Sequence, residues 1–293
     1  MGYSGRYHAA SLAAVFIALA IGILIGIGLA DDVVSTASQE LEQSLRDERD
    51  QAEAEADDLR AQLDEEEQFS DDAYPALVDR KLAKRKFAVI ELGDVPDDEV
   101  DDTADEAIDA AEQAGGELAS VSSIELPLDV AALIDDVGGR AEGLRNDPGD
   151  LERLGRLVGS GLAGGGELID RSKESLFTRF NGSLEGVSLL ILIRNPATDL
   201  GDKQQERYDA LEAGLIQGAR EGAAGVVGVE SSSTDPTTLD VFSEQDVATV
   251  DNVDTPAGKV SLVYALDGAE GDFGGKDAAD SMLPDLQPND PSP

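Results

Sequence analysis

Residues 11–30 form one unbroken apolar run without a charged side chain, and this run constrains the chain more than any other segment. A helix rises about 1.5 Å per residue, so a run of this length reaches about 30 Å, the thickness of the hydrocarbon core of a bilayer. The run stops at Asp31 and Asp32, and the chain after it is polar, acidic and long enough to fold. We therefore expect a transmembrane helix followed by one large domain.

The flanks of the apolar run indicate its orientation. Arg6 precedes the run, whereas no basic residue follows it before Arg46. Because positive charge favours the cytoplasmic side, residues 1–10 are expected to form a cytoplasmic tail, with the main domain extracytoplasmic. The alternative is a cleavable signal peptide, since residues 28–30 resemble a cleavage site, but the run exceeds the roughly 7–15 apolar residues of a signal-peptide core. We favour an uncleaved, single-pass anchor in the cell membrane.

Small residues recur at every fourth position of the run, a spacing that lets two membrane helices approach closely. They include Ala14, Ala18, Gly22 and Gly26. Composition alone is the alternative explanation, because glycine is frequent in membrane helices. A second copy of the chain is the partner that this helix-packing face would take.

Residues 33–68 predict a helical stalk. Its leucines and alanines are separated by sevens, fours and threes, with charged residues between them and no glycine or proline. This pattern is typical of a short coiled coil, although its phase breaks between Leu45 and Ala52. A solvated helix without a partner is the alternative. We expect homo-oligomerisation through the membrane helix and this stalk, and an end to the helix within 69–75.

Charge and composition exclude several classes of function. The chain of 293 residues carries 62 acidic and 22 basic residues, a formal net charge of −40. This surplus repels nucleic acid and is most simply explained by solubility in an ion-rich medium. Without cysteine there is no disulfide or thiolate metal site. The only histidine, His8, lies at the membrane boundary, so a histidine-based triad or zinc site is excluded from the main domain.

From about residue 85 the sequence alternates between short apolar runs and amphipathic segments. Such alternation predicts a mostly parallel sheet covered by helices, within an extracytoplasmic α/β domain at 70–268. The Gly-, Asp- and Pro-rich residues 269–293 predict a disordered acidic tail. Expected strands are 87–92, 117–124, 187–193 (the central one), 224–229 and 259–266; expected helices are 97–114, 129–136, 149–163, 170–180 and 202–220.

Three polar residues, Asp94, Arg194 and Glu230, follow expected strands, and in parallel sheets ligands bind beyond the carboxyl ends of strands. They are either the acids and the anion clamp of a sheet-edge pocket or ordinary turn and capping residues, which we favour. The spacing of Gly159, Gly161 and Gly164 fits a dinucleotide fingerprint but follows a helix-like segment, so we reject it. No catalytic residue or cofactor is predicted, and a metal ligand set stays unassigned.

The basic cluster between Arg80 and Lys86 is the only dense one in the chain. An anion contact is one interpretation. We favour the other, a helix carboxyl end where cations are stabilised by the helix dipole.

Two stretches resemble a known family. Residues 7–20 with Gly22 and Gly26, and residues 248–260, resemble the actinobacterial MctB-like proteins (copper transport protein B). The second stretch carries the motif residues Val250, Asp251, Val253, Asp254 and Gly258. The order of membrane segment, coiled coil, α/β domain and late motif also matches, over about 7–268. The resemblance implies a non-enzymatic role in copper transport or efflux and copper homeostasis at the cell envelope, with copper ions as a candidate partner.

The residues themselves offer little soft-metal chemistry. Cu(I) prefers Cys, Met and His, and apart from His8 the chain has only Met1 and Met282. The late motif is interpreted as a capped turn leading into an inner strand, and binding of copper or another divalent ion by its carboxylates is the alternative. The alternative function is a structural envelope scaffold that dimerises through its stalk and recruits partners without binding metal. An exported enzyme or binding domain that uses the sheet-edge residues is a third.

Overall fold

The computed structural model describes residues 5–94 and 102–286, without the side-chain environments of 5–6, 27–40, 67 and 71. The chain divides into two compact units, Met1–Glu67 and Gln68–Pro293. The first unit is helical: α1 spans Gly5–Val78 and includes all of it from Gly5 onward. Within α1, Tyr7–Gly26 is the one helical segment of the described chain that is long and apolar enough to cross a membrane. The expected N-terminal apolar helix is therefore confirmed.

The stalk region is helical throughout, as expected. Its described leucines, Leu41, Leu45, Leu59 and Leu63, are 56–63% exposed in the single chain. No described part of the chain buries them, and the pairing that would make a coiled coil stays a prediction.

The expected end of the helix at 69–75 is wrong. α1 continues to Val78 with Pro75 inside it. A proline there removes one helix hydrogen bond, but the following turn is held by the second unit. Val78 is fully buried, and the Tyr74 hydroxyl donates to the carbonyl of Ala110 at 3.3 Å. Burial of the last turn therefore outweighs the proline.

The second unit contains one seven-stranded sheet in the order β3-β2-β1-β4-β5-β6-β7. Every pair is parallel except β2 with β3, and the predicted central strand is indeed the fourth of the seven. The mostly parallel α/β sheet is thus confirmed. The strands are β1 Lys86–Gly93, β2 Glu117–Glu125, β3 Arg179–Gly182, β4 Val187–Asn195, β5 Gly225–Val229, β6 Ala248–Val250 and β7 Asp272–Phe273.

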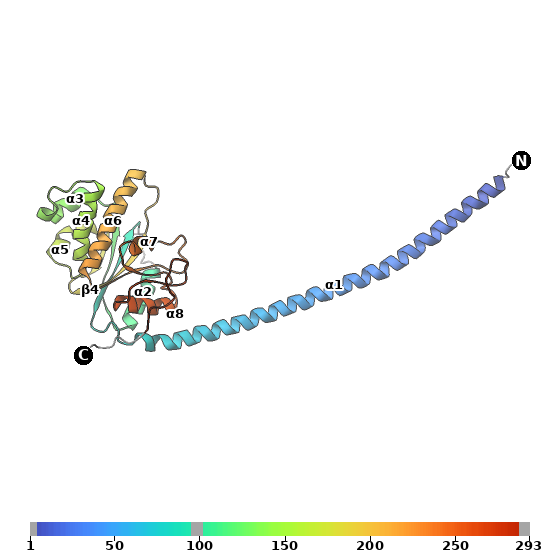
Figure 1. Cartoon of the computed structure of the whole chain (residues 1–293), viewed down its shortest axis with the longest axis horizontal. Helices are drawn as coiled ribbons and strands as arrows, with labels where there is room; N and C mark the ends of the chain where they lie inside the picture. The colour runs from blue at the N-terminus through green and yellow to red at the C-terminus, as the bar shows by residue number, and fades with distance from the viewer. Residues whose placement is uncertain (1–4, 95–101, 287–293) are drawn as a thin grey trace. The chain divides into compact units, whose positions relative to one another are not determined.

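Helices cover both faces of this sheet, so the domain has three layers (Figure 1). One face packs against α3–α6 and the other against α2, α8 and the last turn of α1. Alternate residues of β1 enter the two cores: Ile90 lies in the first and Val89 in the second. The helices are α2 Asp102–Gln113, α3 Val130–Val137, η1 Gly138–Arg140, α4 Pro148–Leu162, α5 Glu167–Leu176, α6 Asp202–Gly222, α7 Asp240–Ser243 and α8 Pro256–Leu266.

Helix α8 replaces the strand expected at 259–266, and this expectation is wrong. The segment is buried on almost every side, so its apolar run carries no helical period to distinguish it from a buried strand. The residues that indicate a helix lie at the start of the segment. Thr255 caps the helix by accepting from the N–H of Gly258 at 3.1 Å, and Pro256 occupies the first turn.

The disordered tail expected at 269–293 is also wrong over its described part. β7 joins the sheet beside β6, and Phe273 is buried in the second core. The segment 272–286, called the C-terminal segment below, is therefore part of the domain. Residues 287–293 and the expected helix start at 97–101 lie outside the described residues.

Helices α4 and α6 pack backbone to backbone through glycines. A Cβ atom built on Gly159 of α4 would lie 2.2 Å from the carbonyl oxygen of Leu215. One built on Gly218 of α6 would lie 2.2 Å from the carbonyl oxygen of Arg156. Backbone atoms cannot move aside as flexible side chains do, so these positions set the separation of the two helices. Gly159 therefore serves helix packing rather than a dinucleotide site.

Replacing Gly159 by alanine is predicted to destabilise the domain by about 1–3 kcal/mol, because α4 and α6 must separate. Gly149→Ala is the matched control in the same helix. Its added Cβ meets only the Asp147 side chain at 3.8 Å, so it is expected to be neutral or stabilising by about 0.4–1 kcal/mol. Urea unfolding followed by tyrosine fluorescence measures both. Equal stabilities of the two variants would contradict the packing argument.

Candidate functional site

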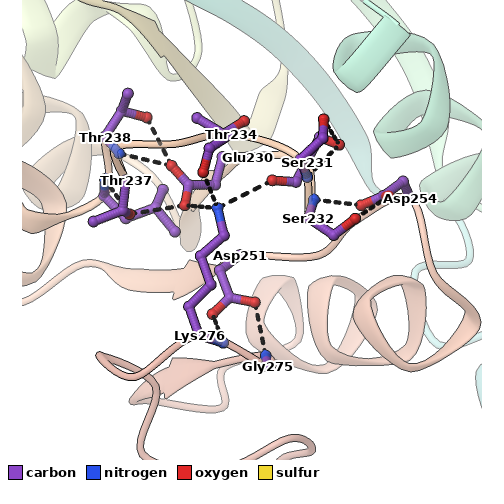
Figure 2. Close-up of polar contacts among 12 residues, drawn as sticks. Glu230, Ser231, Ser232, Thr234, Thr237, Thr238, Asp251, Asp254, Gly275 and Lys276 are labelled. Carbon is purple, nitrogen blue, oxygen red and sulfur yellow. Dashed lines mark hydrogen bonds and ion pairs between the residues drawn. The ribbon is translucent and has the colours of Figure 1, made fainter. Parts of the chain in front are cut away.

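The carboxyl ends of β5 and β6 carry the densest polar network among the described residues that follow the strands (Figure 2). Glu230 comes directly after β5, and Asp251 directly after β6. The two strand ends are joined by the N–H of Glu230, which donates to the carbonyl of Val250 at 3.0 Å. Parallel pairing therefore brings two carboxylates from distant parts of the sequence to one edge of the sheet.

Glu230 is only 3% exposed and its carboxylate is fully engaged. Oε2 accepts from the N–H of Thr238 at 2.7 Å and from its hydroxyl at 3.0 Å, and Oε1 accepts from the Thr237 hydroxyl at 2.7 Å. The Lys276 ammonium forms an ion pair with Oε1 at 2.6 Å. A buried carboxylate is costly unless it is paired and hydrogen-bonded, and these four donors meet both conditions.

Asp251 holds the C-terminal segment by its backbone. Its two carboxylate oxygens accept from the N–H groups of Gly275 and Lys276, each at 2.8 Å. A Cβ on Gly274 would lie 1.8 Å from the Asp251 carboxylate, so only glycine permits this approach. Together with the Lys276–Glu230 pair, these bonds fasten the C-terminal segment across the carboxyl edge.

Asp254 anchors the loop after β5. Its carboxylate accepts from the N–H of Ser232 at 2.7 Å and from the hydroxyl of the same residue at 2.6 Å. Burial opposes ionisation of Asp254, but the hydrogen bonds from Ser232 outweigh it and hold its pKa below the usual value. This carboxylate therefore stays charged and structural at neutral pH.

Each residue of the late motif, Val250 to Gly258, that resembles the known family has a structural role in the fold. Val250 and Val253 are fully buried, and the two aspartates make the bonds described above. Gly258 lies so close to the preceding turn that a Cβ would lie 1.9 Å from the carbonyl oxygen of Asn252. The expected inner strand after the motif is instead α8, but the capped turn is present. These residues fix the C-terminal third of the fold.

The three residues weighed as a possible sheet-edge pocket, Asp94, Arg194 and Glu230, make no direct polar contact with one another in the described structure, which is compatible with the turn and capping roles that we favoured. Asp94 is exposed, and its N–H donates to the carbonyl of Asn195 at 2.8 Å. That bond joins the carboxyl ends of β1 and β4, the edge of the sheet beyond which ligands bind in folds of this type.

Arg194 belongs to a separate buried group beneath the end of β4. Its Nε donates to Glu212 Oε1 at 2.8 Å, and the Tyr208 hydroxyl donates to the same oxygen at 3.3 Å. Burial lowers the pKa of Arg194, but the hydrogen bond and charge of Glu212 outweigh it and the net shift is upward. Burial, aided by the charge of Glu212, raises the pKa of the Tyr208 hydroxyl, which remains a donor. The anion clamp is thus occupied by an internal carboxylate.

The residues between Arg80 and Lys86 directly follow the end of α1, and the last turn of α1 itself holds no basic residue. Two of them are used internally. Lys81 lies 3.8 Å from the centroid of the Tyr264 ring, and Arg85 pairs with Asp267 at 3.1 Å. The cluster therefore connects the C-terminal end of α1 to the C-terminal end of α8.

Sequence reasoning missed Lys276 and the two threonines that hold Glu230. Lys276 did carry a signal, because it is the only basic residue after Lys259. Across residues 5–94 and 102–286, no group of three or more His, Asp or Glu side chains is arranged to hold a metal ion. The contacts described above make the carboxyl edge a site of ion pairing and of docking for the C-terminal segment.

The protonation of Asp254 gives a test of this network. Because its folded pKa is lowered, its contribution to stability is complete above the unfolded pKa of about 3.9 and is lost as pH falls through the folded value. Urea unfolding should show that the stability difference between the native protein and Asp254→Asn shrinks below about pH 4. Asp135→Asn, at an exposed position on α3, is the matched surface control. A constant difference for Asp254→Asn across the acid range would refute the assignment.

Comparison with known proteins identifies a family to which nearly the whole chain is similar. The family model described as "Copper transport outer membrane protein, MctB" matches residues 3–284. The match includes the apolar part of α1 and the α/β domain with most of its C-terminal segment. No curated protein matches the chain.

Proposed function

The chain belongs to the MctB family of copper transport outer membrane proteins, and we propose that it is a non-enzymatic envelope protein that acts in copper transport and homeostasis. The observation that carries the proposal is the extent of the family match, which covers nearly the whole chain. A match to the α/β domain alone would leave the membrane attachment unexplained. Here the same family model spans the apolar helix, the stalk and the late motif.

The proposed topology is a single pass with the N-terminus in the cytoplasm. Tyr7–Gly26 has the length and composition of a membrane helix. Arg6 before it and two aspartates after it support this orientation. In this arrangement the stalk and the α/β domain lie outside the cell membrane.

The proposed copper role does not rest on a soft metal site in the domain. The chain has no cysteine, and His8 and Met1 lie at its N-terminal end. Met282 is half-exposed, and its sulfur accepts from the Asn252 amide at 3.6 Å. One thioether is a poor Cu(I) site, because Cu(I) is held by several Cys, Met or His ligands. We therefore propose that the domain supports copper movement through assembly and position.

Growth of a deletion strain across a copper series tests the copper role. We expect the strain to become copper-sensitive and to regain tolerance when the full chain is restored. A parallel zinc series is the control, in which deletion is expected to have little effect. Unchanged growth in copper would remove the transport proposal and favour the alternative, an envelope scaffold that acts without metal.

We further propose that the chain forms homo-oligomers through its membrane helix and stalk. Four exposed leucines on α1 support a pairing seam, and small residues at Ala14, Ala18, Gly22 and Gly26 permit close membrane packing. This feature also favours the scaffold alternative, since such a stalk can hold copies together without any metal. The two functions therefore share an assembly and differ in their copper response.

Charge placed in the seam tests the assembly. Leu59→Asp with Leu63→Asp should shift the full chain in detergent toward the monomer, because two charges would enter an apolar interface. Ala61→Asp is the control, since it adds charge on the opposite face of the helix and should change little. Cross-linking and light scattering report the oligomeric state. If the double variant stays as associated as the native chain, the stalk does not mediate assembly.

A further inference from the structure

The ammonium group of Lys276 is enclosed by oxygen atoms. Besides Glu230 Oε1 at 2.6 Å, it donates to the carbonyl oxygens of Thr234 at 2.6 Å and Ser231 at 3.2 Å (Figure 2). One carboxylate and two carbonyls in this arrangement are the kind of ligand set that proteins use for hard cations. We refer to Glu230 Oε1, Ser231 O and Thr234 O as the oxygen cage.

The oxygen cage is built by residues that do not depend on Lys276. The Glu230 carboxylate is oriented by Thr237 and Thr238. The turn that carries the two carbonyls is closed by the N–H of Thr234, which donates to the carbonyl of Ser231 at 3.0 Å. The N–H of Val253 donates to the carbonyl of Glu230 at 3.2 Å and fixes the backbone from the other side. Removal of the ammonium would therefore leave the three oxygens in place.

We propose that the oxygen cage is a binding site for a small hard cation, and that the chain fills it with its own Lys276. The chemical class is set by the ligands, which suit a primary ammonium or an oxygen-preferring metal ion. Cu(I) prefers sulfur and nitrogen, so this site is distinct from the proposed copper role. The C-terminal segment acts as a tethered cation that competes with free cations of the medium.

Tethering decides when a free cation enters. A group on a short tether has an effective concentration on the order of millimolar, and Asp251 keeps Lys276 near the cage through the two N–H bonds described above. A free cation whose intrinsic affinity equals that of the ammonium must exceed that concentration to displace it. Occupation of the cage by a free cation would then release the Lys276 side chain and loosen the C-terminal segment.

Lys276→Met in the full chain tests the proposal, because it keeps the apolar stem and removes the charge. With the cage vacant, methylammonium should raise the melting temperature of this variant in a saturable way, by about 2–4 °C. Tetramethylammonium at the same ionic strength has no N–H donors and should have no saturable effect. The native chain should show no comparable response at low millimolar methylammonium. Potassium and calcium, titrated separately, distinguish an ammonium site from a metal site.

Two variants make the outcome decisive. Lys276→Met combined with Glu230→Gln should lose the saturable response, since the cage has lost its charge. Lys203→Met, at an exposed position on α6, should show no saturable response. If Lys276→Met is unfolded at low salt, refolding on addition of methylammonium replaces the melting shift as the supporting result. Equal responses of the single and double variants, or none at all, would overturn the proposal.

Discussion

The central strands β1 and β4 carry large apolar side chains on both faces, with Glu91 of β1 the buried exception, and the rest of the domain depends on covering them. A strand of this kind needs a helix layer on each side of the sheet. Two separate cores result, one under α3–α6 and one under α2, α8 and the last turn of α1. The same requirement explains two helical segments whose sequences alone do not favour a surface helix. The turn after Pro75 remains helical because Val78 is buried. Helix α8 has no polar face because it lies almost wholly inside the second core.

This constraint explains which parts of the fold could be predicted. Residues 187–193 are recognisable as the central strand because a run of Leu and Ile that long has no solvent-facing side. Helix α6 shows its period because one face is exposed. The periodicity of apolar residues cannot distinguish a helix from a strand where the segment is buried on every side, as at 259–266. There only the Thr255-Pro256 cap indicates a helix. Composition wrongly predicts disorder for the C-terminal segment. Its glycines and aspartates instead allow the backbone to lie close to neighbouring groups and to make contacts with them.

The sequence allowed Glu230 to be placed at the carboxyl edge of the sheet, but it did not indicate that this residue pairs with Lys276. Glu230 could be placed at a strand end, yet its partner Lys276 lies 46 positions further along the chain. No local pattern links two such residues. The family motif behaved differently, because Asp251, Asp254 and Gly258 each bond or pack within the turns that join β5, β6 and α8. A motif of this kind marks a fold as much as an activity, which is why it could indicate the family without revealing a metal site.

Charge links the domain, the stalk and the proposed assembly. With a net charge of −40, two copies repel at long range, and at physiological salt such repulsion is screened beyond about 8 Å. Contacts between stalk leucines act at much shorter range, so they contribute fully once screening lets the copies approach. In the proposed single-pass topology, one membrane helix per chain offers no aqueous path of its own, because its backbone groups are satisfied internally and its side chains are apolar. Any movement of copper across a membrane through this protein must therefore involve several copies or a partner, and the exposed seam of α1 is the described feature best suited to bring them together.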